Sequence, residues 1–310
     1  MNKISKNKIK TWFVTGASSG VGHELCSQLL EKGYNVIAVS RRIPDFNHNN
    51  ALCLSVDVKD IDSIKLAVEK GIRRFGKIDV LSNNAGITAN ILLEDETSEH
   101  LKEVLETNFY GTFNTMKVLS SHFRENNNGT IINNTSQSGL SPRSYGSAYC
   151  ASKHAIEAIS GVFRIEAQHF CRVMTLELGY FSGTGIMQKA STIKNQYPEY
   201  SKLKAPHKPI NYSKFKNDLH KAISILITEV EKEKIQRHLI LGKDAIIRIE
   251  AELKTLETDL KTSKSRAISC SIPKYKQNKF IENIFSVKNS QNKKHKIITI
   301  LGIKIKFRRK

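Results

Sequence analysis

Tyr149 and Lys153 lie four residues apart in the segment SAYCASKHA, residues 147–155. On a helix this spacing places a phenol and an ammonium on one face, where the cation could stabilise a phenolate and let the tyrosine exchange protons. The same spacing recurs at Tyr200 and Lys204, at Tyr212 and Lys216, and at Tyr275 and Lys279. The spacing alone therefore identifies no catalytic pair, and neighbouring residues must distinguish Tyr149.

Two further polar residues could complete a site for hydride chemistry. Ser136 ends the run TIINNTS, thirteen residues before Tyr149, and Asn108 lies in TNFYG. Carbonyl reduction by hydride leaves an alkoxide that needs a proton. A phenol active at neutral pH needs its pKa lowered by about three units, roughly 4 kcal/mol, which Lys153 could supply. Ser136 could donate a hydrogen bond to the substrate oxygen. Taken singly, Ser136 could instead satisfy the backbone at a strand end, and Asn108 could be an ordinary buried amide.

A glycine-rich turn, TGASSGVG, follows the first β-branched run and contains Gly16, Gly20 and Gly22. Residues without Cβ let the backbone approach a pyrophosphate that lies on the N-terminus of the next helix. This context predicts a dinucleotide site, although a plain structural turn is the alternative.

Short apolar runs alternate with helical stretches along the chain. Helices are predicted over about 20–32, 60–75 and 97–123 and around Tyr149. The predicted strands are TWFVTG from residue 11, NVIAVS from 35, ALCLSV from 51, KIDVLSNN from 77, TIINNTS from 130, CRVMTLEL from 171 and RHLILG from 237. This order predicts an α/β fold, a Rossmann-like doubly wound parallel sheet that binds ligands at the carboxyl ends of its strands.

These motifs together resemble the short-chain dehydrogenase/reductase family, in its shorter TGxxxGxG and YxxxK subgroup, over about residues 11–260. The resemblance implies a catalytic tetrad of Ser136, Tyr149, Lys153 and Asn108, in which Asn108 holds a water and Lys153 also holds the nicotinamide ribose. It implies the following cofactor-binding residues: Gly16, Ser18, Ser19, Gly20, Val21, Gly22, Ser40, Arg41, Arg42, Asp57, Val58, Asn84, Ala85, Gly86, Lys153 and Thr184. One departure is Leu178, which stands where the family has proline.

The end of the second predicted strand bears on the choice of cofactor. Ser40 stands where an NAD-binding member would carry an acid, and Arg41 and Arg42 follow it. Two guanidinium groups can offer charge-assisted hydrogen bonds to a 2′-phosphate, so NADP(H) is expected in preference to NAD(H). The alternative is that the two arginines belong to a solvated loop.

Composition limits the class of protein. The five cysteines contain no CxxC pair and the histidines show no metal-ligand spacing, so neither a disulfide framework nor a metal site is expected. Without an apolar run of about 18 residues, a cytoplasmic protein is expected. Of the net charge of +20, residues 261–310 carry +14 and residues 1–10 carry +4, which leaves the central region nearly neutral. Nucleic acid is therefore not an expected partner.

The expected organisation is a basic extension over 1–10, a Rossmann domain over 11–262 and a basic tail over 263–310. A helix from Asp244 carries an apolar stripe for the domain or for a second subunit, and a polar, mobile stretch follows over 263–296. The alternation of apolar and basic residues from Leu301 to Arg308 predicts an amphipathic strand. This tail resembles basic segments of bacterial surface-polysaccharide enzymes. It could contact anionic lipid at the inner membrane face, add a strand to the sheet edge of a partner protein, or be a solvated tail without a partner.

We therefore expect an NADP(H)-dependent oxidoreductase that interconverts a carbonyl and an alcohol on a small molecule, with a role in surface-glycan metabolism as one option. The resemblance also implies a homo-oligomer. Residues 185–215 occupy the family's substrate-covering position and, being rich in lysine, suit a polar or anionic substrate. The alternative function is a dinucleotide-binding interaction or membrane-surface protein whose catalysis is vestigial.

Overall fold

The computed structural model describes residues 9–181, 184, 197–202 and 217–270, and the backbone of three later strands. The chain divides into two compact units, Met1–Glu252 and Leu253–Lys310. The predicted domain boundary at residue 262 stays a prediction.

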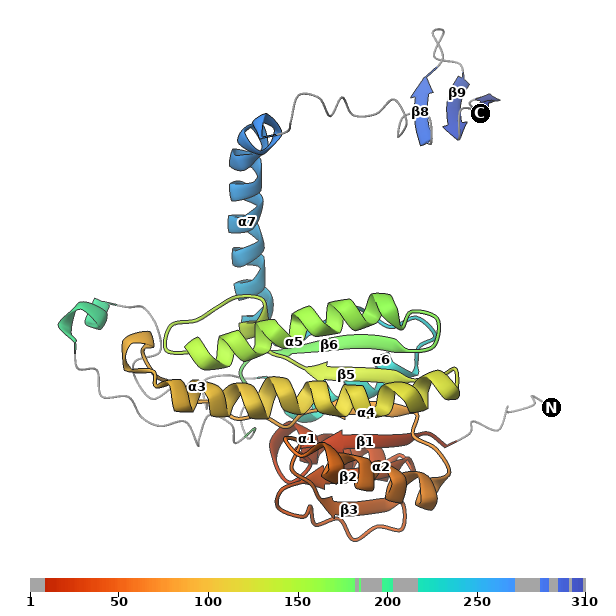
Figure 1. Cartoon of the computed structure of the whole chain (residues 1–310), viewed down its shortest axis with the longest axis vertical. Coiled ribbons are helices and arrows are strands. Elements are labelled where there is room, and N and C mark those ends of the chain that lie inside the picture. The colour runs from red at the N-terminus through yellow and green to blue at the C-terminus, as the bar shows by residue number, and fades with distance from the viewer. Residues whose placement is uncertain are drawn as a thin grey trace. The chain divides into compact units, whose positions relative to one another are not determined.

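The first unit is built on a seven-stranded sheet whose order is β3-β2-β1-β4-β5-β6-β7 (Figure 1). All of its pairings are parallel. The strands are β1 (Thr11–Thr15), β2 (Asn35–Ser40), β3 (Ala51–Ser55), β4 (Val80–Asn83), β5 (Thr130–Asn134), β6 (Arg172–Leu178) and β7 (His238–Leu241). Because β1 has β2 on one side and β4 on the other, the winding reverses there. In a doubly wound sheet this reversal is where ligands bind, beyond the carboxyl ends of the strands. The predicted doubly wound fold is confirmed.

Helices cover both faces of this sheet. They are α1 (Gly20–Glu31) and α6 (Leu219–Glu231) on one face, and α2 (Ile61–Phe75), α4 (Gly111–Glu125) and α5 (Ser147–Glu166) on the other. Two further helices are α3 (Ser98–Leu105) and α7 (Lys243–Ser269). Three short 3-10 turns, η1 (Leu93–Asp95), η3 (Gln137–Gly139) and η4 (Pro198–Lys202), lie in the connections.

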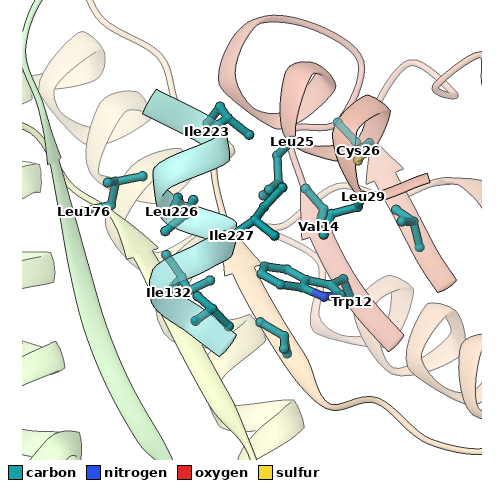
Figure 2. Packing of buried hydrophobic residues seen from close by; sticks show 14 of the residues in the cluster. Trp12, Val14, Leu25, Cys26, Leu29, Ile132, Leu176, Ile223, Leu226 and Ile227 are labelled. Atoms are coloured by element: carbon teal, nitrogen blue, oxygen red, sulfur yellow. The ribbon is translucent and has the colours of Figure 1, made fainter. Parts of the chain in front are cut away.

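Alternation along the strands divides the core into two layers. On β1, Trp12 and Val14 face the layer under α1 and α6, whereas Phe13 faces the layer under α2 and α4. Figure 2 shows the first layer, in which Leu25 of α1 and Ile227 of α6 lie against the β1 side chains. These side chains are fully or almost fully buried. Two packed layers hold the strand ends in fixed positions, as a site at those ends requires.

The helix predicted over 97–123 is interrupted by one turn of π-helix, η2 (Glu106–Tyr110). Such turns insert an extra residue into an α-helix and frequently occur at functional sites. Asn108 lies inside this turn and is fully buried. The interruption therefore sets the direction in which the asparagine side chain leaves the helix.

The second unit holds a three-stranded antiparallel sheet, β8 (Phe285–Asn289), β9 (His295–Ile300) and β10 (Ile303–Arg308). The amphipathic strand expected from 301 to 308 coincides with β10, but β8 and β9 were not predicted. Helix α7 continues to Ser269, and β8 and the start of β9 also fall within 263–296. The expected mobility of this stretch stays a prediction. On α7, Ile249 is buried, and Leu256 of the predicted stripe is 62 % exposed. None of the helices in the described ranges is long and apolar enough to span a membrane.

Candidate active site

The glycine turn after β1 forms a close contact with the segment after β4. Gly16 has a left-handed backbone, with φ of 65°, and a Cβ there would lie 2.8 Å from the backbone nitrogen of Ala85. A Cβ on Gly22 would lie 2.5 Å from the Gly16 carbonyl oxygen. Both distances are too short for any side chain, so the turn depends on glycine. The N-cap residue of α1, Ser19, makes no capping hydrogen bond. The turn therefore offers bare backbone at a helix N-terminus, which fits a dinucleotide pyrophosphate.

The segment after β4 is fixed to β1 by one hydroxyl group. Thr15 Oγ1 accepts hydrogen bonds from the backbone nitrogens of Asn84 at 2.9 Å and Ala85 at 3.1 Å. A Cβ on Gly86 would lie 3.2 Å from Asn108 Oδ1. The loop after β1 and the loop after β4 are thus held together. The predicted cofactor residues Asn84, Ala85 and Gly86 lie where these two loops meet.

The predicted nucleoside-binding residues gather at the ends of β2 and β3. Arg42 Nη2 donates to the carbonyl oxygen of Ser18 in the glycine turn at 3.1 Å. Ser40 Oγ donates to the Arg42 carbonyl, and the Arg41 carbonyl accepts from Ser55 Oγ at 2.9 Å. Arg41 and Arg42 are both exposed. The Arg42 guanidinium therefore lies beside the turn, where it can reach an anionic group on a bound nucleotide.

Three other predicted cofactor residues lie around this region. Asp57 Oδ1 accepts from the Lys59 backbone nitrogen at 3.0 Å, and Val58 is buried against Gly111 of α4. The Thr184 carbonyl oxygen would lie 2.3 Å from a Cβ on Gly20, so Thr184 lies directly on the glycine turn. The remaining members of the predicted set, Ser18 and Val21, lie in the turn and in the first turn of α1.

Helix α5 and the end of β5 bring the predicted catalytic residues together. The side chains of Ser136 and Tyr149 are hydrogen-bonded. Lys153 Nζ lies 5.6 Å from the centre of the Tyr149 ring and donates to the Asn134 carbonyl oxygen at 2.7 Å. Lys153 is only 5 % exposed. Tyr149 thus lies beside both a strand-end serine and the lysine four residues after it.

Asn108 is linked to these residues indirectly. Its Nδ2 donates to the Ile87 carbonyl oxygen at 2.9 Å and to Ser152 Oγ at 3.0 Å, while its Oδ1 accepts from the Ile87 backbone nitrogen at 2.8 Å. The side chain therefore connects the loop after β4 to helix α5. These hydrogen bonds fix the position of the lysine-bearing helix relative to the loop after β4. The expected role of Asn108 in holding a water stays a prediction.

Burial works against the chemistry expected of Tyr149. Removal from water raises the pKa of the phenol to about 12, and the Ser136 hydrogen bond and the Arg143 charge act in the lowering direction. Burial also lowers the pKa of Lys153 to about 8, against the charge of Glu157. The sequence-based expectation considered Lys153 as the cation that lowers the pKa of the phenol. The structure places a second cation, Arg143, near the same ring.

Sequence reasoning missed Arg143. Its guanidinium carbon lies 5.9 Å from the centre of the Tyr149 ring, and its Nη1 is held by Asn90 Oδ1 at 2.8 Å. Gly146 allows this approach, because a Cβ there would lie 3.2 Å from the Arg143 guanidinium carbon. Within the described residues Arg143 forms no ion pair. An arginine six residues before a tyrosine carries no recognisable signal in one sequence.

The predicted substrate-covering segment is described only over 197–202. Two tyrosines attach this part to η1: Tyr197 donates to Asp95 Oδ1 at 3.3 Å, and Tyr200 donates to Glu94. Residues 185–196 and 203–215 lie outside the described residues.

Comparisons with known proteins agree with this geometry. The family model described as short chain dehydrogenase matches residues 10–195. A 3-ketodihydrosphingosine reductase of Bacteroides thetaiotaomicron is 35% identical over 191 residues, covering 61% of this chain and 70% of that protein. Dehydrogenase/reductase SDR family member 7 of Mus musculus is 31% identical, over 60% of this chain and 54% of its own length. A solved short-chain dehydrogenase from Streptomyces avermitilis is 27% identical, with a TM-score of 0.77 over 86% of this chain and all of that chain.

Proposed function

Because the chain belongs to the short-chain dehydrogenase family, we propose that Tyr149, Lys153 and Ser136 carry its reaction and that it uses NADP(H) in preference to NAD(H). Membership makes it an NAD(P)-dependent oxidoreductase that interconverts a carbonyl and an alcohol. One observation supports the proposed site most directly. The Ser136–Tyr149 hydrogen bond, the buried Lys153 and the glycine turn all lie at the ends of neighbouring strands.

The dinucleotide, when bound, supplies or accepts the hydride. Tyr149 gives a proton to the substrate oxygen during reduction and removes it during oxidation. Ser136, hydrogen-bonded to the phenol, is placed to donate to the same substrate oxygen. Lys153 and Arg143 place two positive charges near the phenol ring and favour its phenolate form. Asn108 keeps the lysine-bearing helix fixed to the loop after β4.

The preference for NADP(H) rests on Arg42. Its hydrogen bond to the glycine turn places a guanidinium beside the nucleotide site, and Ser40 leaves the end of β2 without an acid that would repel a phosphate. Arg41 adds a second exposed cation next to it.

The experiment that tests this function is turnover of a carbonyl panel with NADPH and with NADH. The panel contains 3-ketodihydrosphingosine, because one relative is named for it, and keto sugars, because the tail resembles segments of surface-polysaccharide enzymes. We expect NADPH oxidation with at least one member of the panel and a higher kcat/KM for NADPH. Tight NADPH binding without any turnover would favour the vestigial, binding-only function.

We also propose two further properties. Exposed apolar side chains on α4 and α5, Phe113, Val162 and Ile165, support a homo-oligomer, which sedimentation velocity would reveal. The charge of +14 over residues 261–310 supports contact with anionic membrane surface at the cytoplasmic face. Cosedimentation with phosphatidylserine vesicles, compared between the full chain and a chain that ends at Thr262, tests that contact.

A further inference from the structure

A group of three titratable side chains lies between helix α5 and strands β6 and β7. His238 Nδ1 is 2.9 Å from Glu177 Oε1 and 3.7 Å from Glu157 Oε2. Thr175 Oγ1 donates to Glu177 Oε1 at 2.5 Å. One ligand atom from each of Glu157, Glu177 and His238 lies within 4.8 Å of the others. We call these three residues the carboxyl cluster.

The two carboxyl groups of the cluster lack the partners that two negative charges would need. Glu177 is fully buried, and 11 % of the Glu157 side chain is exposed. Both oxygens of Glu157 and Oε2 of Glu177 are shielded from water and have no hydrogen bond of good geometry. Thr135 lies close enough to Glu157 to lower the pKa of its carboxyl group, an effect smaller than that of burial and Glu177. Two buried carboxylates at this separation repel each other strongly, so one of them retains a proton at a pH where an exposed pair would be ionised. In agreement, burial and the neighbouring Glu177 raise the pKa of Glu157 to about 7.

The carboxyl cluster lies one helical turn from the catalytic lysine. Lys153 and Glu157 are four residues apart on α5, on one face of the helix. Lys153 Nζ donates to the Asn134 carbonyl, and among the described residues no carboxylate lies within ion-pair distance of it. The negative charge of Glu157 raises the pKa of Lys153, whereas burial lowers it. The charge of this acid therefore governs how readily the buried amine stays protonated.

We propose that Glu157 and Glu177 share one proton beside His238, and that this pair sets the charge of Lys153, which makes Glu157 a positioning residue for the reaction. When the pair loses its proton, Glu157 becomes negative and holds Lys153 as an ammonium. When the pair is protonated, Lys153 releases its proton more easily. The proposal rests on the proposed function, in which the ammonium form of Lys153 is the active one.

The other charged groups near Glu157 agree with this arrangement. Glu177 on β6 raises the pKa of Glu157, and His238 on β7 lowers it. Arg164, two turns further along α5, is a weaker cation for the cluster, since its guanidinium is engaged by the carbonyl oxygens of Val173 at 3.0 Å and Arg237 at 3.2 Å. In the described structure, Lys153 is the only lysine whose charge interacts with that of Glu157 strongly enough to shift a pKa.

The two glutamates make different predictions, which a direct titration of Lys153 can separate. In protein labelled with [6-13C]lysine, the Lys153 signal is identified by its loss in Lys153→Arg and is followed from pH 6 to 11. Glu157→Gln removes the opposing charge, so the Lys153 midpoint falls by about one pH unit, a tenfold change in the protonated fraction. In Glu177→Gln, Glu157 ionises at lower pH and is still negative at the Lys153 midpoint near pH 8, so that midpoint changes little.

Glu166→Gln, at the exposed end of the same helix, is the matched control and leaves the midpoint unchanged. An unchanged midpoint in Glu157→Gln, or an equally large fall in Glu177→Gln, would overturn the proposal. So would a stoichiometric metal ion whose removal with EDTA moves the midpoint, because the cluster would then hold a cation in place of a proton. If Glu157→Gln does not fold, Glu157→Leu removes the same charge without leaving a buried amide, and the same fall is expected. None of these readouts needs turnover, so absence of catalysis would contradict the proposed function alone.

Discussion

Replacement of Arg143 by methionine tests whether a second cation supports the phenol of Tyr149, the proposed proton donor. The guanidinium carbon lies 5.9 Å from the Tyr149 ring centre. At an effective dielectric constant of about 20, unit charges at this separation interact by roughly 3 kcal/mol, or about two pKa units. Arg143 is only half-buried, so solvent screens part of this, and we expect a shift of about one unit.

The sign of the effect follows from the chemistry. Alcohol oxidation requires the phenolate, so the rate rises with pH through the pKa of Tyr149. Loss of the nearby positive charge raises that pKa, so the Arg143→Met profile moves to higher pH by about one unit and the rate below the midpoint falls about tenfold.

The assay is the pH dependence of kcat/KM for oxidation with NADP⁺, alongside absorbance titration of the tyrosinate in the protein without substrate. Arg124→Met, on the exposed end of α4, is the control for loss of a surface charge. Coincident profiles of Arg143→Met and wild type in both measurements would refute the argument that Arg143 acts on the phenol. A uniform loss of rate at every pH would likewise show a structural role only.

Two further predictions concern the cofactor and the lysine. Arg42→Ala removes a guanidinium from the 2′-phosphate side, so the Kd for NADPH, measured by fluorescence, rises about ten- to a hundredfold while that for NADH stays constant; equal losses for both would contradict the assignment. Lys153→Met removes a buried ammonium whose pKa is lowered to about 8. Below pH 8 the folded state carries the full cost of that charge, roughly 3 kcal/mol, and between pH 8 and 10.5 the cost disappears because the folded lysine is neutral. The variant should therefore be inactive yet more stable to urea at pH 7, with the gain lost by about pH 10.5; a gain that does not change with pH would point to packing alone.

The sheet and the main parts of the site could be predicted because their signals are local. The glycine turn and the spacing of Ser136, Tyr149 and Lys153 each lie within or beside one element. The strand order follows from the alternation of strands and helices. The seven predicted strands of the first unit match β1 to β7 within a few residues.

The features that sequence reasoning missed depend on contacts between distant elements. Arg143 reaches Tyr149 through a loop whose conformation no local pattern specifies. The carboxyl cluster joins Glu157, Glu177 and His238 from three elements, so the histidines looked scattered in the sequence. The π-turn that contains Asn108 adds one residue to a helical period, too little for the apolar pattern to reveal.

The central claim is that Tyr149 transfers the proton while the dinucleotide transfers hydride. The most direct measurement is a single-turnover reduction with NADPH by wild type and by Tyr149→Phe, with NADPH affinity determined for both proteins. We predict equal affinity and a hydride-transfer rate lower by several orders of magnitude in the phenylalanine variant, since the hydroxyl is the group removed. Comparable rates in the two proteins would contradict it.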